Sequence, residues 1–145
     1  MFRRTRKVRK YPRRGQNLIS KKKLQPITWK ISHEDVKAAL KRKGIEVKAV
    51  RKMTYLKHQV CISYWDAKNN PCSSFFSYRI FEMWATEVAK LITYCPTLRE
   101  WQELNRLMRY EFKYYDYLPA TENALRMALE NRLYVLQATK PLAVF

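Results

Sequence analysis

The sequence predicts an α+β fold: a small antiparallel three-stranded sheet with one helix before it and about three C-terminal helices. Three observations lead to this prediction. Short runs rich in β-branched and aromatic residues lie between residues 46 and 78. Apolar residues repeat at helical spacing from residue 79 to residue 138. The 145 residues include only 2 glycines, which argues against an all-β fold dominated by loops.

The first helix is expected from His33 to Lys43. Ser32 is suited to cap its N-terminus, and Asp35, three residues later, is suited to complete a capping box. Acidic residues at its start and basic residues at its end match the helix dipole. Gly44 follows as a residue that readily adopts the left-handed conformation after a helix.

Three strands are expected at Glu46–Tyr55, at Gln59 to Tyr64 or Trp65, and at Cys72–Tyr78. The segment 66–71 reads Asp-Ala-Lys-Asn-Asn-Pro, and this cluster of turn-forming residues predicts a hairpin. A turn centred between Lys68 and Asn69 would pair Trp65 with Cys72, Ser63 with Ser74 and Cys61 with Phe76.

This register would give the hairpin two different faces. The apolar face would belong to the core, and it would carry Val60, Ile62, Tyr64 and Phe75. The second face would mix small polar and aromatic side chains: Cys61, Ser63, Trp65, Ser74, Phe76 and Tyr78. Two alternatives remain for the second face. Either it is exposed and binds a partner, or the C-terminal helices cover it as a second core layer.

Three helices are expected after the sheet, at Arg79–Tyr94, Thr97–Lys113 and Thr121–Ala138. A proline lies in each of the two gaps between them, where a helix cannot easily continue. Thr97 and Glu100 have the spacing of a capping box.

The charge balance divides the chain. It contains 30 Lys and Arg residues against 12 Asp and Glu, and 11 of the 30 lie in the first 26 residues, which hold no acid. Such a segment cannot bury enough apolar surface to fold alone. We therefore expect a basic flexible arm at 1–26 and a single α+β domain at 27–145, with a sheet part at 45–78 and a helical part at 79–138.

A net charge of +18 predicts a polyanionic partner, because uncompensated positive charge repels itself. Nucleic acid is the expected polyanion, DNA first and RNA second, ahead of an anionic membrane surface. No apolar run approaches the ~20 residues that span a bilayer. The candidate phosphate-binding cations are Arg3, Arg4, Arg6, Lys7, Arg9, Lys10, Arg13, Arg14, Lys21, Lys22, Lys23, Lys41, Arg42, Lys43, Lys48, Arg51, Lys52, Lys57 and Arg79.

The second face of the hairpin suggests two ways of reading nucleic acid. Its aromatic side chains can stack on unpaired bases, and these are Trp65, Phe76 and Tyr78. Alternatively, a sheet laid in the major groove can address base edges through Arg51, Ser63, Ser74 and Arg79.

The segment 46–92 resembles two families of DNA-binding domain. The run 59–78 (QVCISYWDAKNNPCSSFFSY) and the helix expected at 80–92 are similar to the domains of plant ethylene-response factors and to the arm-binding domains of tyrosine-recombinase integrases. In both families a three-stranded sheet enters the major groove and a helix packs behind it. The resemblance implies that the residues approaching DNA are Arg51, Lys52, Trp65, Ser74, Phe76 and Tyr78.

Catalysis is not expected. Glu46, Val47 and Lys48 with Asp35 upstream are similar to the acid-x-Lys element of restriction-endonuclease-like folds, in which carboxylates hold a metal and Lys polarises the phosphate. Asp35, however, belongs on a helix and not on the preceding strand. We expect neither an enzyme nor a cofactor.

The cysteines and histidines indicate no metal site. Cys61, Cys72 and Cys95 are odd in number and form no CxxC pair, and the histidines His33 and His58 lie at no ligand spacing from them. A disulfide framework is therefore not expected, which is typical of a reducing, intracellular compartment.

Tyrosines crowd the end of the third expected helix, from Tyr110 to Tyr117. They suit helix packing, or alternatively a protein–protein contact such as self-association. Taken together, the sequence favours a non-enzymatic nucleic-acid-binding protein that acts through a basic arm and a small basic sheet. Two alternatives stay open: an RNA-bound subunit of a ribosome or other ribonucleoprotein, and a virion or assembly protein contacting packaged nucleic acid.

Overall fold

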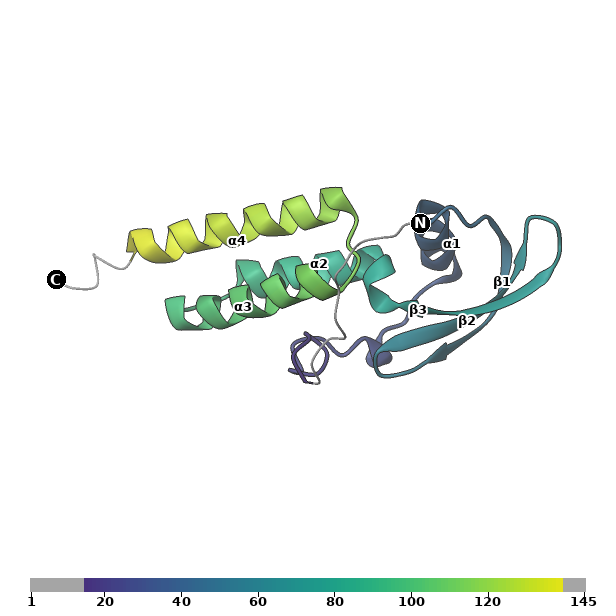
Figure 1. Cartoon of the computed structure of the whole chain (residues 1–145), viewed down its shortest axis with the longest axis horizontal. Helices are drawn as coiled ribbons and strands as arrows, with labels where there is room; N and C mark the ends of the chain where they lie inside the picture. The colour runs from purple at the N-terminus through teal and green to yellow at the C-terminus, as the bar shows by residue number, and fades with distance from the viewer. Residues whose placement is uncertain (1–14, 140–145) are drawn as a thin grey trace, which may run out of the picture. The chain divides into compact units, whose positions relative to one another are not determined.

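The structure is a computed structural model that describes residues 15–139, and it confirms the α+β fold (Figure 1). One helix precedes a three-stranded sheet and three helices follow it, as predicted. The elements in chain order are α1 (His33–Arg42), β1 (Val47–Tyr55), β2 (Gln59–Asp66), β3 (Pro71–Ser77), α2 (Glu82–Thr93), α3 (Leu98–Tyr114) and α4 (Pro119–Thr139), with short 3-10 turns at Pro26–Thr28 and Tyr78–Ile80.

The chain divides into two compact units. The sheet unit comprises residues 24–87, and the helical unit joins the chain up to residue 23 to the chain from residue 88 onward. The boundary between the two units falls inside α2, and the single α+β domain at 27–145 stays a prediction. The first turns of α2 carry Trp84, whose ring contacts Trp29 in the sheet unit with 6.3 Å between ring centroids.

The predicted helix caps are confirmed. The Ser32 hydroxyl accepts a hydrogen bond from the backbone N–H of Asp35 at 3.0 Å, and α1 begins at the next residue after Ser32. Gly44 follows the helix with a φ of +84°, in the left-handed region that glycine adopts at little cost. At the start of α3, the Thr97 hydroxyl accepts from the Glu100 N–H at 3.1 Å.

The sheet is antiparallel throughout, with the strand order β1-β2-β3. The predicted hairpin register was wrong by one residue: the structure pairs Cys61 with Phe75, Ser63 with Ser73, Tyr64 with Cys72 and Trp65 with Pro71. The reason lies in the turn. Asp66 and Asn70 close a three-residue loop through the bond from Asp66 N–H to Asn70 O at 3.0 Å, and Asn69 has a φ of +68°. A left-handed residue at this position is typical of three-residue hairpin loops.

The one-residue shift exchanges the two neighbouring phenylalanines between the faces, because successive side chains of a strand point in opposite directions. Phe75, predicted to lie in the core, pairs with Cys61 and is 58 % exposed. Phe76, predicted on the second face, pairs with Val60 on the core-facing side. The same shift places Ser73 rather than Ser74 opposite Ser63.

The side chain of Asp66 holds the turn together. One carboxylate oxygen accepts hydrogen bonds from the N–H groups of Lys68 at 2.9 Å and Asn70 at 2.8 Å. These bonds, that of Asn70 above all, lower the pKa of Asp66 from its ordinary value. The ionised carboxylate therefore favours the turn.

We expect acid to loosen this turn. A depressed pKa stabilises the folded hairpin above the pKa of the unfolded chain, and this contribution disappears as pH falls through the lower, folded-state pKa. NMR titration should show the amide resonances of Lys68 and Asn70 shifting together, with a midpoint below the ordinary pKa of 3.8. A midpoint at or above the ordinary value would contradict this role of Asp66, and Asp66→Asn should abolish the titration.

The core of the sheet unit lies between α1 and one face of the sheet (Figure 1). The side chains that fill it are wholly or almost wholly buried: Val36, Ala39 and Leu40 from α1, Val60, Ile62 and Tyr64 from β2, and Tyr78, Phe81 and Trp84 after the sheet. Burying each large apolar side chain contributes roughly 1.5–3 kcal/mol. The sheet therefore has one buried face and leaves the other to solvent.

The helical unit includes part of the segment that was predicted to be a flexible arm. Leu18 is 0 % exposed, and Ile19 is buried as well, so a defined conformation begins well before residue 27. The bonds from Lys21 N–H to Asn17 O and from Lys23 N–H to Leu18 O, at 3.0 and 2.9 Å, fold this segment into a compact turn. The part of the arm before residue 15 lies outside the described residues.

One buried carboxylate fastens this turn to α3. Glu111 is 0 % exposed, and its two oxygens accept hydrogen bonds from the Leu18 N–H at 3.1 Å and the Tyr117 hydroxyl at 2.6 Å. The amide of Asn17 donates to the Tyr115 hydroxyl at 2.9 Å. At least these two tyrosines of the 110–117 stretch therefore pack inside the unit.

Candidate nucleic-acid interface

The exposed side of the sheet combines basic, aromatic and small polar side chains. We call it the outer face, and its residues are Arg51, Lys52 and Thr54 on β1, Cys61, Ser63 and Trp65 on β2, and Pro71, Ser73 and Phe75 on β3. They are exposed or half-exposed, so this face is not a second core layer.

A bulge in β1 positions the arginine of the outer face. The pairing with β2 skips a residue between Val50 and Lys52, and Arg51 occupies the extra position. Its guanidinium carbon lies 5.3 Å from the centroid of the Trp65 ring. This cation–π contact holds a positive charge against an aromatic surface that is itself half-exposed.

The centre of the outer face is a shallow polar strip. The hydroxyls of Ser63 and Ser73 lie 3.2 Å apart across β2 and β3, and the Cys61 sulfur lies 3.6 Å from the Ser73 hydroxyl. Phe75, on β3 beside this strip, is 58 % exposed. An aromatic ring this accessible can stack on a base, since every base has a π-face.

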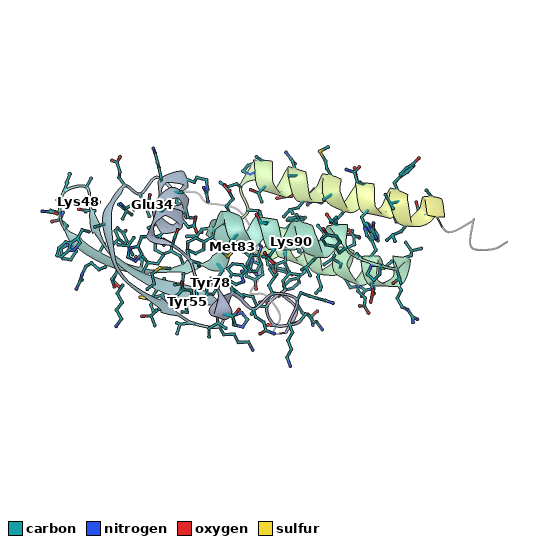
Figure 2. The ribbon with its side chains drawn as sticks, turned by 180° about the vertical axis from the view of Figure 1, so that it is seen from behind. Glu34, Lys48, Tyr55, Tyr78, Met83 and Lys90 are labelled. Carbon is teal, nitrogen blue, oxygen red and sulfur yellow. The ribbon has the colours of Figure 1, made fainter. Side chains whose placement is uncertain are left out.

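Tyr78, a predicted nucleic-acid contact, is buried in the core of the sheet unit. It is 0 % exposed, its hydroxyl donates to the Leu56 carbonyl at 2.6 Å, and its ring stacks on Tyr55 with 6.5 Å between centroids (Figure 2). Burial raises the pKa of Tyr78 to about 12, so the hydroxyl remains a donor. Phe76, another predicted contact, is half-exposed and lies on the core-facing side of β3 opposite Val60.

The remaining predicted cations of the sheet unit take different positions. Lys48, at one end of the sheet, donates to the Asn69 side-chain oxygen at 3.0 Å (Figure 2). The guanidinium of Arg79 lies 4.5 Å from the Trp84 ring and donates to the Ser77 hydroxyl at 3.1 Å, so this arginine packs within the unit. Arg42 donates to the Ile80 carbonyl at 3.0 Å.

The turn between β1 and β2 is electropositive. Burial first, and then the charges of Lys57 and Arg79, lower the pKa of His58 from its ordinary value. The exposed cations Lys41 and Lys43 lie at the end of α1 in the same unit.

Other predicted cations lie away from the sheet unit. Lys21, Lys22 and Lys23 belong to the turn of the helical unit and are exposed. The remaining arm candidates, which are Arg3, Arg4, Arg6, Lys7, Arg9, Lys10, Arg13 and Arg14, lie outside the described residues.

The chain matches no known family. Searches against protein-family models, curated proteins and solved structures found nothing similar to it. The resemblance of residues 46–92 to sheet-plus-helix DNA-binding domains therefore stays a prediction.

Among residues 15–139, no cluster of three His, Cys, Asp or Glu side chains is suited to hold a metal ion. Asp35 lies in the first turn of α1, and Lys48 is bonded to Asn69 at the hairpin turn. Cys61, Cys72 and Cys95 are free thiols. Within the described part of the chain, no helix has the length and apolar character needed to cross a membrane.

Sequence reasoning missed Phe75 and placed Phe76 in its stead. The signal in the sequence was the adjacent pair of phenylalanines, because only one of two neighbouring residues in a strand can face the core. Which of the two does so depends on the conformation of Asn69, which the sequence leaves open.

Proposed function

We propose that this chain is a non-enzymatic nucleic-acid-binding protein, and that the outer face of its sheet contacts unpaired bases and the phosphates beside them. The observation that carries the proposal is the presence of Phe75, Trp65, Arg51 and Lys52 on one exposed surface. Aromatic platforms beside cations are the usual means of binding single strands.

The charge of the whole chain supports the same partner. A net charge of +18 gives a strong attraction to phosphodiester backbones, with little dependence on sequence. Binding to phosphates does not require an exposed aromatic ring. The exposed ring of Phe75 therefore favours a partner with unpaired bases over a duplex. DNA stays the first choice from the sequence analysis and RNA the second, and the comparison of the three probes below decides between them.

The test compares one sequence in three forms. Fluorescence anisotropy with the full chain at about 50 mM salt should show tighter binding to single-stranded DNA than to duplex DNA, with single-stranded RNA as the third probe. Tighter binding to RNA would change the preferred partner and leave the outer face as the contact surface. Absence of binding to all three would refute the proposal.

The salt dependence identifies the phosphate contacts. Replacing Arg51 and Lys52 by glutamine should make the slope of log K against log salt shallower by about 1.4, since each phosphate contact on a single strand contributes about 0.7. A matched control removes the same charge from exposed positions on α3, as Arg99→Gln with Arg109→Gln. Equal changes in the two double variants would show that only net charge matters.

A further inference from the structure

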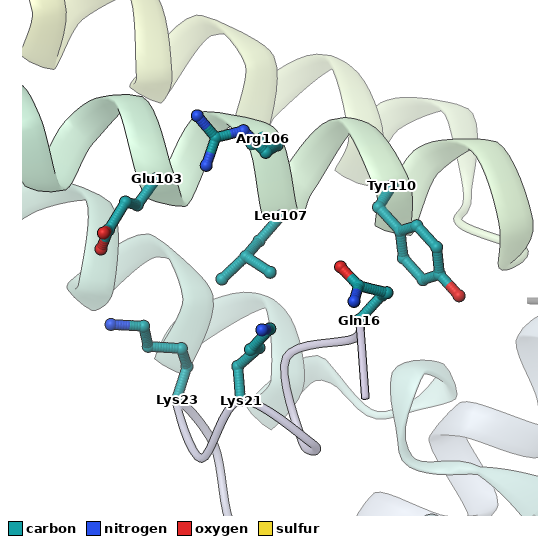
Figure 3. A pocket seen from close by; sticks show the side chains of 7 residues that line it. All are labelled: Gln16, Lys21, Lys23, Glu103, Arg106, Leu107 and Tyr110. Carbon is teal, nitrogen blue, oxygen red and sulfur yellow. The ribbon is translucent and has the colours of Figure 1, made fainter. Parts of the chain in front are cut away.

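A small cavity lies in the helical unit, between the turn at residues 16–23 and α3 (Figure 3). Its volume is about 370 Å³, which is near the lower end of the range for small-molecule sites. The lining side chains are Gln16, Lys21, Lys23, Glu103, Arg106, Leu107 and Tyr110.

The lining is positively charged. Lys21, Lys23 and Arg106 supply three cations against the single carboxylate of Glu103. Among residues 15–139, none of these three cations forms an ion pair with an acidic side chain. Holding like charges around one cavity costs electrostatic free energy, and an anion bound there would relieve it.

The two lysines are held in place by the turn that carries them. The Lys22 residue between them has a φ of +60°, a left-handed conformation that costs roughly 1 kcal/mol for a residue with a side chain. The Lys22 N–H donates to Ile19 O at 2.9 Å, and the bond from Leu18 to buried Glu111 fixes the turn on α3. The backbone of the site is therefore organised before any ligand arrives, which lowers the entropy cost of binding.

The rest of the lining suits a ring. Lys21 and Lys23 on the turn and Arg106 on α3 lie on opposite sides of the cavity, the Leu107 side chain extends from α3 between them, and the aromatic ring of Tyr110 stands at one side (Figure 3). Cations and an aromatic ring in one cavity match the phosphate and the base of a nucleotide.

From this arrangement we infer that the cavity binds one phosphate-bearing nucleotide unit, with the phosphate at Lys21, Lys23 and Arg106 and the base toward Leu107 and Tyr110. Two sources supply this chemistry: a free mononucleotide and the phosphorylated end of a nucleic-acid strand. The inference concerns the helical unit alone and does not depend on the outer face of the sheet.

The experiment titrates the full chain with AMP, with adenosine as the phosphate-free probe, and with one oligonucleotide bearing either a 5′-phosphate or a 5′-hydroxyl. Calorimetry should detect AMP and not adenosine, and NMR should map the amide shifts to residues 16–23 and 103–110. Lys21→Gln with Arg106→Gln should weaken AMP binding about a hundredfold, roughly tenfold for each charge-assisted hydrogen bond to the phosphate that the variant cannot form. Arg109→Gln, an exposed cation of α3 outside the lining, is the matched control.

The outcomes separate the two sources and the two proposals. If the 5′-phosphate raises the affinity for the oligonucleotide, and the double variant loses this increase, the ligand is the phosphorylated end of a strand. If AMP binds but the 5′-phosphate does not raise the affinity for the oligonucleotide, the ligand is the free nucleotide. Variants of Trp65 and Phe75 should leave AMP binding unchanged. The inference fails if neither AMP nor the 5′-phosphate contributes, or if the double variant binds both as the native chain does. Both substituted side chains are exposed, so circular dichroism should show an unchanged fold.

Discussion

Replacing Trp65 and Phe75 together by alanine is expected to weaken the binding of a single-stranded oligonucleotide about a hundredfold, because each base–aromatic stack contributes about 1–3 kcal/mol. The two rings lie on β2 and β3 of the same exposed face, so one strand can contact both. Anisotropy titrations of the two single variants and the double variant measure the effect. The salt slope should stay as in the native chain, since no cation is removed.

The control for this pair is an exposed aromatic residue elsewhere in the chain. Tyr94 and Tyr134 are 75 % and 74 % exposed and lie just after the C-terminal end of α2 and in α4. Tyr94→Ala with Tyr134→Ala should leave the affinity unchanged. If this control reduces the affinity as much as the Trp65 and Phe75 variant does, the outer face has no special role.

Replacing Glu111 by alanine should destabilise the helical unit by about 4 kcal/mol, the sum of about 2 kcal/mol for each of the two hydrogen-bond donors that lose this acceptor. These donors are the Leu18 N–H and the Tyr117 hydroxyl, and Glu111 itself is 0 % exposed. At about 4–8 °C for each kcal/mol in a unit of this size, the melting temperature should fall by roughly 15 °C or more. Thermal unfolding followed by circular dichroism measures this.

Two further variants serve as controls for the stability loss expected of Glu111→Ala. Glu111→Gln retains one side-chain oxygen as an acceptor, and it should reduce stability less than the alanine variant does. Glu130→Ala removes an exposed glutamate from α4 and should change stability by less than about 0.5 kcal/mol. A native melting temperature for Glu111→Ala would show that the turn at residues 17–23 is held by other contacts.

Much of the local structure was predictable, because it depends on neighbours in the sequence. The caps at Ser32 and Thr97 and the left-handed Gly44 follow from residue types at fixed spacing, and the structure confirms them. The order of one helix, three strands and three helices follows from hydrophobic periodicity. The excess of positive charge, from which the nucleic-acid prediction came, is likewise a property of the sequence alone.

The candidate sites were predicted only in part, since they depend on choices that local sequence does not make. The structure places Arg51, Lys52 and Trp65 together on the outer face, where Phe75 takes the position predicted for Phe76 because a loop of odd length shifts the register by one residue. The lysines at 21–23 favoured the prediction of a flexible arm, and the apolar Leu18 and Ile19 just before them were therefore not predicted to be buried.

The kind of each element and the sign of the charge therefore follow from the order of residues along the chain. Which side chains share a surface follows from how the chain folds in space. Glu111 accepts a hydrogen bond from Leu18, 93 positions away in the chain, and Lys21 and Arg106 line one cavity although they are far apart in the sequence. The physical reason is that burial and electrostatic proximity depend on distance in space, which periodicity along the chain does not encode.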